Sequence, residues 1–190
     1  MDIERLEIPE VMLLRPRRFA DDRGFFTETW RRDQLQAAGI GDFVQDNMSF
    51  SKAPGTLRGL HYQRPPHAQA KLVSVLTGRI LDVVVDVRRG SPTFGRHLKA
   101  ELSAEDGAQL FVPTGFLHGF VTLEPDTRVA YKVSDYYAAN CDAAVRWDDP
   151  DLGIDWGVSR DRAILSPKDA GAPAFAAFET PFVYGPGVAA

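Results

Sequence analysis

The sequence predicts a mainly β protein, built as a sandwich or barrel with few and short helices. Short runs rich in β-branched and aromatic residues recur along the chain, and clusters of Gly, Pro, Asp and Ser separate them. Only one segment has a clear helical pattern, and the 190 residues contain no internal repeat and no long linker. We therefore expect one domain over residues 1–190, with its core at about 20–170 and a C-terminal tail at 171–190.

The helix and a central hairpin are the most clearly marked elements. Residues 30–38 (WRRDQLQAA) predict a helix, and Gly39 is a suitable residue to end it. Residues 71–76 and 80–87 are β-rich and flank Thr77-Gly78-Arg79, so together they predict a hairpin. The cluster at 88–92 (RRGSP) ends its second strand.

The remaining elements are shorter. Further strands are expected at residues 96–102, 109–112, 119–123 and 127–133. The helical pattern at 161–165 is too short to assign. The tail is rich in Ala, Pro and Gly but also contains four aromatic residues, which disordered segments usually lack. We expect it to lie over the body or against a partner chain.

Composition and charge exclude several classes of protein. A net charge of -4 and a pI of about 5.6 argue against nonspecific nucleic-acid binding, although they allow a local basic pocket. Cys141 is the one cysteine, so no disulfide can form within the chain and a reducing compartment fits. The N-terminus lacks the pattern of a signal peptide, and no window resembles a membrane span. We expect a cytoplasmic protein without membrane or nucleic-acid partners.

One spaced motif indicates a particular kind of sandwich. Gly107 is followed after five residues by Pro113, then by Gly115 and His118 at fixed intervals. This spacing resembles the second signature of the cupin superfamily, whose fold is a double-sheet jelly roll. Thr122 stands where that signature usually has Asn. The resemblance implies a mainly β, cupin-type jelly roll with a few short helices.

The first cupin signature is present only in part, and its substitutions bear on metal binding. Five residues separate Gly55 from His61, but Gln63 replaces the second His. Lys71, which six residues separate from Gly78, replaces the Glu. An amide and an ammonium are poor substitutes for the imidazole and carboxylate ligands of such a metal site. We therefore predict no catalytic metal and no cofactor. A cationic Lys71 is suited to stabilise negative charge that develops on an oxygen.

Seven stretches resemble a narrower family, the dTDP-4-dehydrorhamnose 3,5-epimerases of deoxysugar biosynthesis. They occur in order across most of the chain, at residues 22–28 (DRGFFTE), 44–47 (VQDN), 57–63 (LRGLHYQ), 113–120 (PTGFLHGF), 131–132 (YK), 146–150 (RWDDP) and 165–169 (LSPKD). The resemblance implies epimerisation of dTDP-4-dehydro-6-deoxy-D-xylo-hexose at C3 and C5, through enolates, to dTDP-4-dehydro-L-rhamnose.

The resemblance also assigns catalytic roles. His61 takes the position of the base, and neutral imidazole suits that role because its unperturbed pKa is near ~6.5. Asp169 matches the carboxylate that pairs with this base. Lys71 matches the residue that faces the enolate oxygen, and Tyr131 matches the acid that returns a proton on the opposite face of the sugar.

Substrate-binding positions follow from the same resemblance. They are Arg23, Glu28, Gln45, Asn47, Arg58, His118, Asp142 and Lys168. Asp142 stands where the family often has Glu, and the following Ala143-Ala144 replaces a common Arg-Gly. The family also implies a homodimer in which the N-terminal strand region crosses to the partner, so that Arg23 and Glu28 serve the other chain's site. Phe25 and Phe26 are candidates for stacking or lining.

Other interpretations remain open at this stage. An enzyme that inverts only C3 or only C5 would have nearly the same motifs, and a cupin that merely binds a sugar nucleotide is the non-enzymatic alternative. Lys71 also suits a charged residue on an edge strand, and Tyr131 suits simple packing. The sequence does not decide whether Tyr136 or Tyr137 lines the pocket. We expect His67 and His97 to face solvent.

Overall fold

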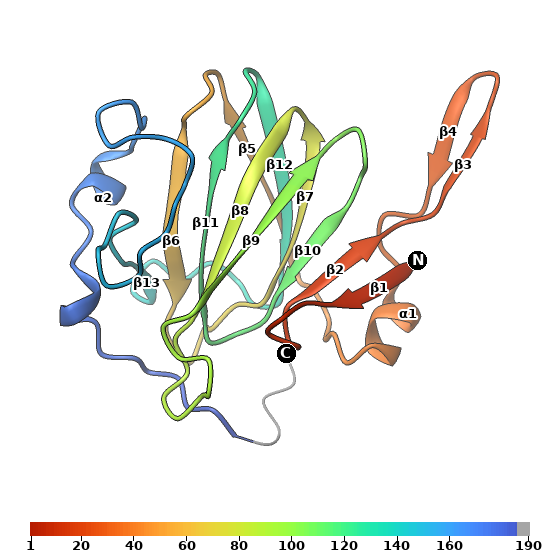
Figure 1. Cartoon of the computed structure of the whole chain (residues 1–190). Helices are drawn as coiled ribbons and strands as arrows, with labels where there is room; N and C mark the ends of the chain where they lie inside the picture. Colours follow the sequence, from red (N-terminus) through yellow and green to blue (C-terminus); the bar gives the residue numbers. More distant parts are fainter. Residues whose placement is uncertain (186–190) are drawn as a thin grey trace.

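The protein, described over residues 1–185 by a computed structural model, is a sandwich of two antiparallel sheets (Figure 1). The six-stranded sheet has the order β1 (Asp2–Arg5), β2 (Met12–Arg15), β10 (Gln109–Val112), β7 (Lys71–Thr77), β12 (Thr127–Val133) and β5 (Gln45–Ser51). The five-stranded sheet has the order β13 (Asp142–Ala144), β6 (Leu57–Gln63), β11 (Phe116–Thr122), β8 (Arg79–Asp86) and β9 (His97–Ser103). This architecture confirms the predicted cupin-type double-sheet jelly roll.

A third, two-stranded sheet stands apart from the sandwich. Strands β3 (Arg18–Asp21) and β4 (Gly24–Thr27) pair only with each other, and Figure 1 shows this hairpin projecting away from the body. Its phenylalanines are largely exposed, and Phe26 has 68% of its surface accessible. A hairpin with this much apolar surface is suited to contact another molecule.

The main core fills the space between the two large sheets. Val73 and Val75 on β7 face Ile80 and Val84 on β8, and Phe120 on β11 joins the same cluster. Alternation with period two places every second residue of these strands in this layer. Most of these inward-facing residues are aliphatic or aromatic, so the space between the sheets is an apolar core there.

The outer faces of both sheets are covered by other segments. Helix α1 (Arg32–Ala37) packs Leu35 against the six-stranded sheet. The C-terminal segment, with α2 (Pro167–Ala170) and the short 3-10 helix η1 (Phe175–Ala177), covers the five-stranded sheet (Figure 1). Phe178 and Phe182 lie edge-on to Tyr62, with ring centroids 5.4 and 6.1 Å away. Up to residue 185 the tail therefore lies over the body, as expected; residues 186–190 lie outside the described part.

Several expected elements need correction. The helix spans residues 32–37 and not 30–38, although Gly39 follows its C-cap with φ +85° as predicted. The strand expected at 119–123 begins at Phe116, because a bulge between His118 and Phe120 hides its regular pattern. Strands β1 to β6 and β13 were not assigned from the sequence; the first four are short, and all of these four except β2 are largely exposed. None of the helices among residues 1–185 is long and apolar enough to cross a membrane.

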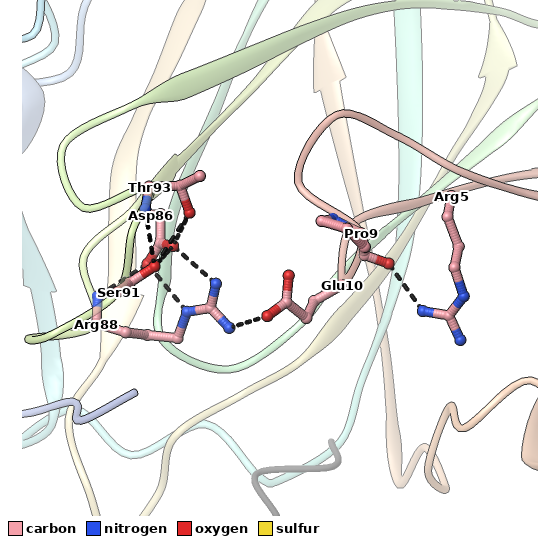
Figure 2. A network of polar contacts seen from close by, with 7 residues as sticks. All are labelled: Arg5, Pro9, Glu10, Asp86, Arg88, Ser91 and Thr93. Atoms are coloured by element: carbon pink, nitrogen blue, oxygen red, sulfur yellow. Dashed lines mark hydrogen bonds and ion pairs between the residues drawn. The ribbon is translucent and has the colours of Figure 1, made fainter. Parts of the chain in front are cut away.

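A buried ion-pair network joins the N-terminal segment to the end of β8. Figure 2 shows the Arg88 guanidinium between the carboxylates of Asp86 and Glu10. Asp86 Oδ2 also accepts hydrogen bonds from Ser91 Oγ and Thr93 Oγ1, each at 2.6 Å. Because every charge here has a partner, the network ties three segments together and leaves no reactive group free.

Candidate active site

A cavity of about 340 Å³ opens between the two sheets, beside the apolar core. Strands of both sheets, β13, α2 and two loops contribute the residues that line it, which are Gln45, Asn47, His61, Tyr62, Gln63, Gln69, Lys71, Tyr131, Tyr137, Asp142 and Lys168. The cavity thus occupies the part of the interior where the alternating positions are polar. Nine of these residues are titratable or amide-bearing groups that the sequence already singled out.

His61 and Asp169 form a close pair at one wall. His61 Nε2 lies 2.5 Å from Asp169 Oδ1, and the Asp169 side chain is only 3% exposed. Burial raises the pKa of Asp169, but the hydrogen bonds from His61 and Ser166 outweigh it and keep that pKa below its usual value. An ionised carboxylate here orients the imidazole and stabilises its protonated form. The predicted pairing of the two residues is present.

The N-terminal turn of helix α2 positions the Asp169 side chain. Ser166 is the N-cap of α2, Pro167 occupies the first turn, and the Asp169 N–H donates to Ser166 Oγ at 3.1 Å. Ser166 Oγ in turn donates to Asp169 Oδ2 at 2.7 Å. This reciprocal capping is typical of a Ser-x-x-acid sequence with Pro after the cap. The motif was visible in the sequence, but its role in holding the carboxylate was not.

Lys71 and Tyr131 come from the sheet opposite His61. Lys71 begins β7 and Tyr131 lies on β12, and both line the cavity. Burial lowers the pKa of Lys71 from 10.5 to about 8, although nearby carboxylates oppose this shift. Burial also raises the pKa of the Tyr131 phenol, so it keeps its proton at neutral pH. An imidazole and a protonated phenol therefore stand on facing walls.

The close approach of two glycines sets the spacing of β6 and β11 next to His61. A Cβ added to Gly59 would lie 2.6 Å from Gly119 Cα, and one added to Gly119 would lie 2.9 Å from Gly59 Cα. Only glycine fits at both positions. His118 is the direct neighbour of His61 across these strands. Gly119 therefore serves the backbone packing of β6 against β11.

A hydrogen-bonded cluster forms the rim of the cavity. Lys168 Nζ lies 2.5 Å from Asp142 Oδ2, which also accepts from Tyr137 Oη at 3.3 Å. On the other side, Gln45 Nε2 donates to Asn47 Oδ1 at 2.8 Å. Five predicted or candidate binding residues therefore meet here. Tyr137 lines the cavity and Tyr136 does not, which settles the choice between them.

Four predicted binding residues are not among the cavity-lining side chains. Arg23 pairs with Asp21 at the tip of the projecting hairpin, and Glu28 follows the end of that hairpin. Arg58 donates to Phe50 O at 3.0 Å, although its charge still lowers the pKa of Tyr131. His118, 6% exposed, bonds to Asp82 behind the cavity. Of the two histidines expected to face solvent, His67 hydrogen-bonds Asp135 Oδ2 at 3.2 Å and remains partly exposed.

Gln63, at the position of a cupin metal ligand, is occupied by structural contacts. Its Nε2 donates to His67 O at 2.7 Å and to Tyr136 O at 3.2 Å, and its Oε1 accepts from Ala138 N at 2.8 Å. The amide therefore holds the loop at the cavity mouth. Within residues 1–185 no group of three or more His, Cys, Asp or Glu side chains is arranged to hold a metal ion.

A larger cavity of about 470 Å³ lies on the outer face of the six-stranded sheet. It is mainly apolar and runs beneath the β3–β4 hairpin, with Phe25, Met48 and Leu76 among its lining residues. It lacks His61, Lys71 and Asp169. The smaller cavity, which His61 and Lys71 line, is therefore the candidate active site.

Sequence reasoning missed three residues of the site. Asp82 is a buried partner of His118, Ser166 holds Asp169, and Gln69 lines the cavity while its Nε2 donates to Asp135 O at 2.8 Å. A signal existed for Asp82, since a carboxylate on the inward face of an otherwise apolar strand needs an explanation. Gln69 carried no comparable signal.

Comparisons with known proteins agree with this geometry. A family model described as dTDP-4-dehydrorhamnose 3,5-epimerase matches residues 5–177. The dTDP-4-dehydrorhamnose 3,5-epimerase of Sinorhizobium fredii is 48% identical, over 97% of this chain and 94% of the relative. The crystal structure of dTDP-6-deoxy-D-glucose-3,5-epimerase from Legionella pneumophila, in complex with dTDP-4-keto-L-rhamnose, matches with TM-score 0.89 and 43% identity over 94% of each chain.

Two further structures show the range of similar proteins. A dTDP-4-dehydrorhamnose 3,5-epimerase from Bacillus anthracis, with TDP and PPi bound, has TM-score 0.88 and 47% identity over 92% of this chain and 99% of its own. A 3'-monoepimerase from Streptomyces bikiniensis, in complex with dTDP-quinovose, has TM-score 0.83 and 37% identity over 91% and 87%. The similarity thus extends to both kinds of epimerase and is greater to the double epimerases.

Proposed function

The chain belongs to the dTDP-4-dehydrorhamnose 3,5-epimerase family, and we propose that it converts dTDP-4-dehydro-6-deoxy-D-xylo-hexose to dTDP-4-dehydro-L-rhamnose. One observation carries this proposal: the His61–Asp169 pair and Tyr131 stand on facing sheets across one cavity. Inversion at carbon requires a base on one face and a proton donor on the other. The proposed route moves only protons at carbons next to the ketone and transfers no hydride, so it needs no redox cofactor.

The proposed reaction proceeds by the same steps at C3 and C5. The 4-keto group acidifies the hydrogen on each neighbouring carbon, and His61 removes that hydrogen as a proton. An enolate forms, and the Lys71 ammonium stabilises the charge on its oxygen. Tyr131 then donates a proton to the opposite face of the carbon, which completes the inversion. Asp169 balances the imidazolium while the enolate exists.

We propose that the site works without a metal. At the two cupin ligand positions that differ, Gln63 is committed to backbone groups of a loop and Lys71 is a cation. The ammonium takes over the electrostatic task that a metal performs elsewhere. Elemental analysis of the purified protein tests this: a stoichiometric metal whose chelation abolishes activity would contradict it.

Deuterium exchange tests the whole proposal. The protein is incubated with the substrate in deuterated water, and C3 and C5 are followed by NMR. Exchange at both carbons, with formation of the L-rhamno product, is expected. Exchange at one carbon alone identifies a monoepimerase, an activity represented by the Streptomyces relative. Tight binding of the nucleotide sugar with no exchange at either carbon identifies a binding protein and contradicts the proposal.

We propose further that the protein is a cytoplasmic homodimer with exchanged hairpins. The projecting β3–β4 hairpin, the exposed Phe25 and Phe26, and the apolar groove beneath them support a contact between two copies. Arg23 lies on this hairpin and does not line the cavity of its own chain. An Arg23 that reaches the partner's cavity would provide the cation suited to a diphosphate.

Mixed dimers test the exchange directly. Arg23→Ala and His61→Ala chains with different tags are each expected to form weakly active homodimers. In a mixed dimer the Arg23→Ala chain keeps its own His61 and receives Arg23 from the partner, so about half of the wild-type activity should return. No recovery in mixed dimers, or a monomer by light scattering, contradicts the arrangement.

A further inference from the structure

Asp82 is a buried carboxylate that none of the roles above uses. It lies in the middle of β8 with its side chain 0% exposed, and Ile80 and Val84 on the same face belong to the apolar core. A carboxylate is costly to bury unless it is paired or performs a task. Its position therefore calls for a partner that benefits from a fixed negative charge.

The hydrogen-bond partner of Asp82 in the described part of the chain is His118. His118 Nε2 lies 2.9 Å from Oδ1 and 3.0 Å from Oδ2. Burial holds the pKa of His118 below its ordinary value, against the opposing effect of Asp82. A neutral imidazole that donates Nε2–H fixes its own tautomer but brings no positive charge. The charge of Asp82 is therefore not cancelled by its hydrogen-bond partner.

Lys71 is the cation on which this charge acts. No carboxylate lies within 4 Å of Lys71 Nζ in residues 1–185, yet Asp82 and Asp142 both favour its charged form. Asp142 is already engaged by Lys168 at 2.5 Å and by Tyr137. The charged and titratable groups around Lys71 are Asp82 on β8, His118 on β11, His61 on β6, Tyr131 on β12, Asp142 on β13 and Lys168 on α2. Asp82 is thus the buried anion left to balance Lys71.

We propose that Asp82 is a positioning residue for the epimerisation, which fixes His118 behind the cavity and supplies the negative charge that keeps Lys71 protonated beside the substrate ketone. The proposal rests on the proposed function, because a charged Lys71 matters only if an enolate forms. Without Asp82, burial would favour neutral Lys71, which cannot offset the charge of an enolate oxygen.

The Asp82→Asn variant tests this inference because it keeps the shape of the side chain and removes its charge. The ionisation of Lys71 is followed by NMR in protein labelled with ¹³C-lysine, and its signal is assigned by its loss in Lys71→Met. The wild-type midpoint is expected near the pKa of about 8. In Asp82→Asn it should fall by about one unit or more. The alkaline limb of the exchange rate should move to lower pH by the same amount.

Asp86→Asn is the matched control. It makes the same change on the same face of β8, but Asp86 is balanced by Arg88 and does not act on Lys71. This variant should lose stability and leave both the Lys71 midpoint and the alkaline limb unchanged. An unchanged midpoint in Asp82→Asn, or an equal shift in the two variants, overturns the inference.

A measurement on the unaltered protein covers the case in which Asp82→Asn does not fold. The ¹⁵N shifts of His118 should show a neutral ring protonated at Nε2 at neutral pH, and a cationic ring or the other tautomer there overturns the inference. Failure of the proposed function is distinguishable from these outcomes. It appears as absent exchange in the wild-type protein, whereas the Lys71 and His118 titrations need no turnover.

Discussion

Strand β8 contains two buried carboxylates, four residues apart on one face, whose surroundings differ. Asp86 accepts hydrogen bonds from the Arg88 N–H and guanidinium and from two hydroxyls (Figure 2). Burial raises the pKa of Asp86, but these bonds outweigh it and leave the pKa below its usual value. Asp82 has one imidazole, that of His118, as its hydrogen-bond partner, and its charge acts on Lys71, which lines the cavity.

The difference between Asp82 and Asp86 shows how the partners of a buried charge indicate whether that charge has a structural or a functional role. A charge whose partners satisfy it completely holds segments together, and the Asp86 network joins β8 to the N-terminal segment through Glu10. A charge that is only partly compensated is retained where it acts on a neighbouring group. The following predictions test whether the surroundings of Asp82 and of Asp86 differ in function in this way, beginning with the largest expected effect.

Removing the base should abolish turnover without loosening the fold. His61→Ala is expected to lower the rate of exchange at C3 and C5 by ~10²- to 10⁴-fold, which is typical for a general base. The thermal midpoint should stay within a few degrees, because the side chain lines a cavity. His97→Ala, on β9 and outside the cavity, is the control and should exchange at the wild-type rate. Full activity in His61→Ala would refute the assigned mechanism.

Breaking the Arg88–Asp86 ion pair should lower stability and leave turnover unchanged. Arg88→Ala leaves Asp86 buried without its cation and should lower the free energy of unfolding by about 3–5 kcal/mol, with kcat unchanged in the folded protein. Urea unfolding and the exchange assay measure the two quantities. Arg79→Ala removes an arginine that is 45% exposed, against 8% for Arg88, and should cost about 1 kcal/mol or less. Equal losses of unfolding free energy in the two variants would show that burial of the Arg88 ion pair does not add to its effect on stability.

Replacing the active-site cation should stabilise the fold and inactivate the enzyme. The pKa of Lys71 falls from 10.5 to about 8 on folding, so the folded state disfavours its charged form below pH 8. Wild-type stability from this group should therefore rise between pH 8 and 10.5. Lys71→Met should be more stable by up to about 3 kcal/mol at pH 7, and the difference should vanish above pH 10.5.

The control for this prediction is Lys99→Met on the exposed strand β9. It should change the unfolding free energy by no more than about 0.5 kcal/mol and should leave the exchange rate unchanged. A Lys71→Met protein that is less stable than wild type at neutral pH would show that burial of the ammonium does not destabilise the folded state.

The smallest effect is expected at the cap that holds Asp169. Ser166→Ala removes the α2 N-cap and one hydrogen bond to the carboxylate, at a cost of about 1 kcal/mol. Because the pKa of Asp169 is lowered on folding, its stabilising effect exists at neutral pH and is lost as pH falls through that pKa. In Ser166→Ala the folded-state pKa of Asp169 should lie closer to its usual value, so this loss should be smaller and complete at a higher pH, and exchange should slow several-fold.

Urea unfolding at several acidic pH values measures the shift. Ser103→Ala, which removes a similar cap from a turn far from the site, should lose comparable stability with exchange unchanged. An acid limb that is the same in Ser166→Ala and wild type would mean that Ser166 does not act on Asp169.

Sequence patterns predicted much of the sandwich and most of the site. The strands at 109–112 and 127–133 appear with the predicted bounds, and the hairpin around Gly78 is shifted by at most one residue. The N-terminal strands were missed because Asp2–Arg5 and Arg18–Asp21 are short, charged and mostly exposed, so no alternation marks them. Family resemblance placed His61, Lys71, Tyr131 and Asp169, and the geometry brings His61 and Asp169 into contact.

By itself the sequence determined the fold class, the resemblance and the types of group available for chemistry, because alternation, turn residues and motif spacing are local properties. Tertiary structure decided which groups meet. His61 and Asp169 are 108 residues apart in the chain, and Asp82 meets His118 only through strand pairing. The charge state of a buried lysine likewise depends on carboxylates from other strands, and one-dimensional spacing contains no information about such distances.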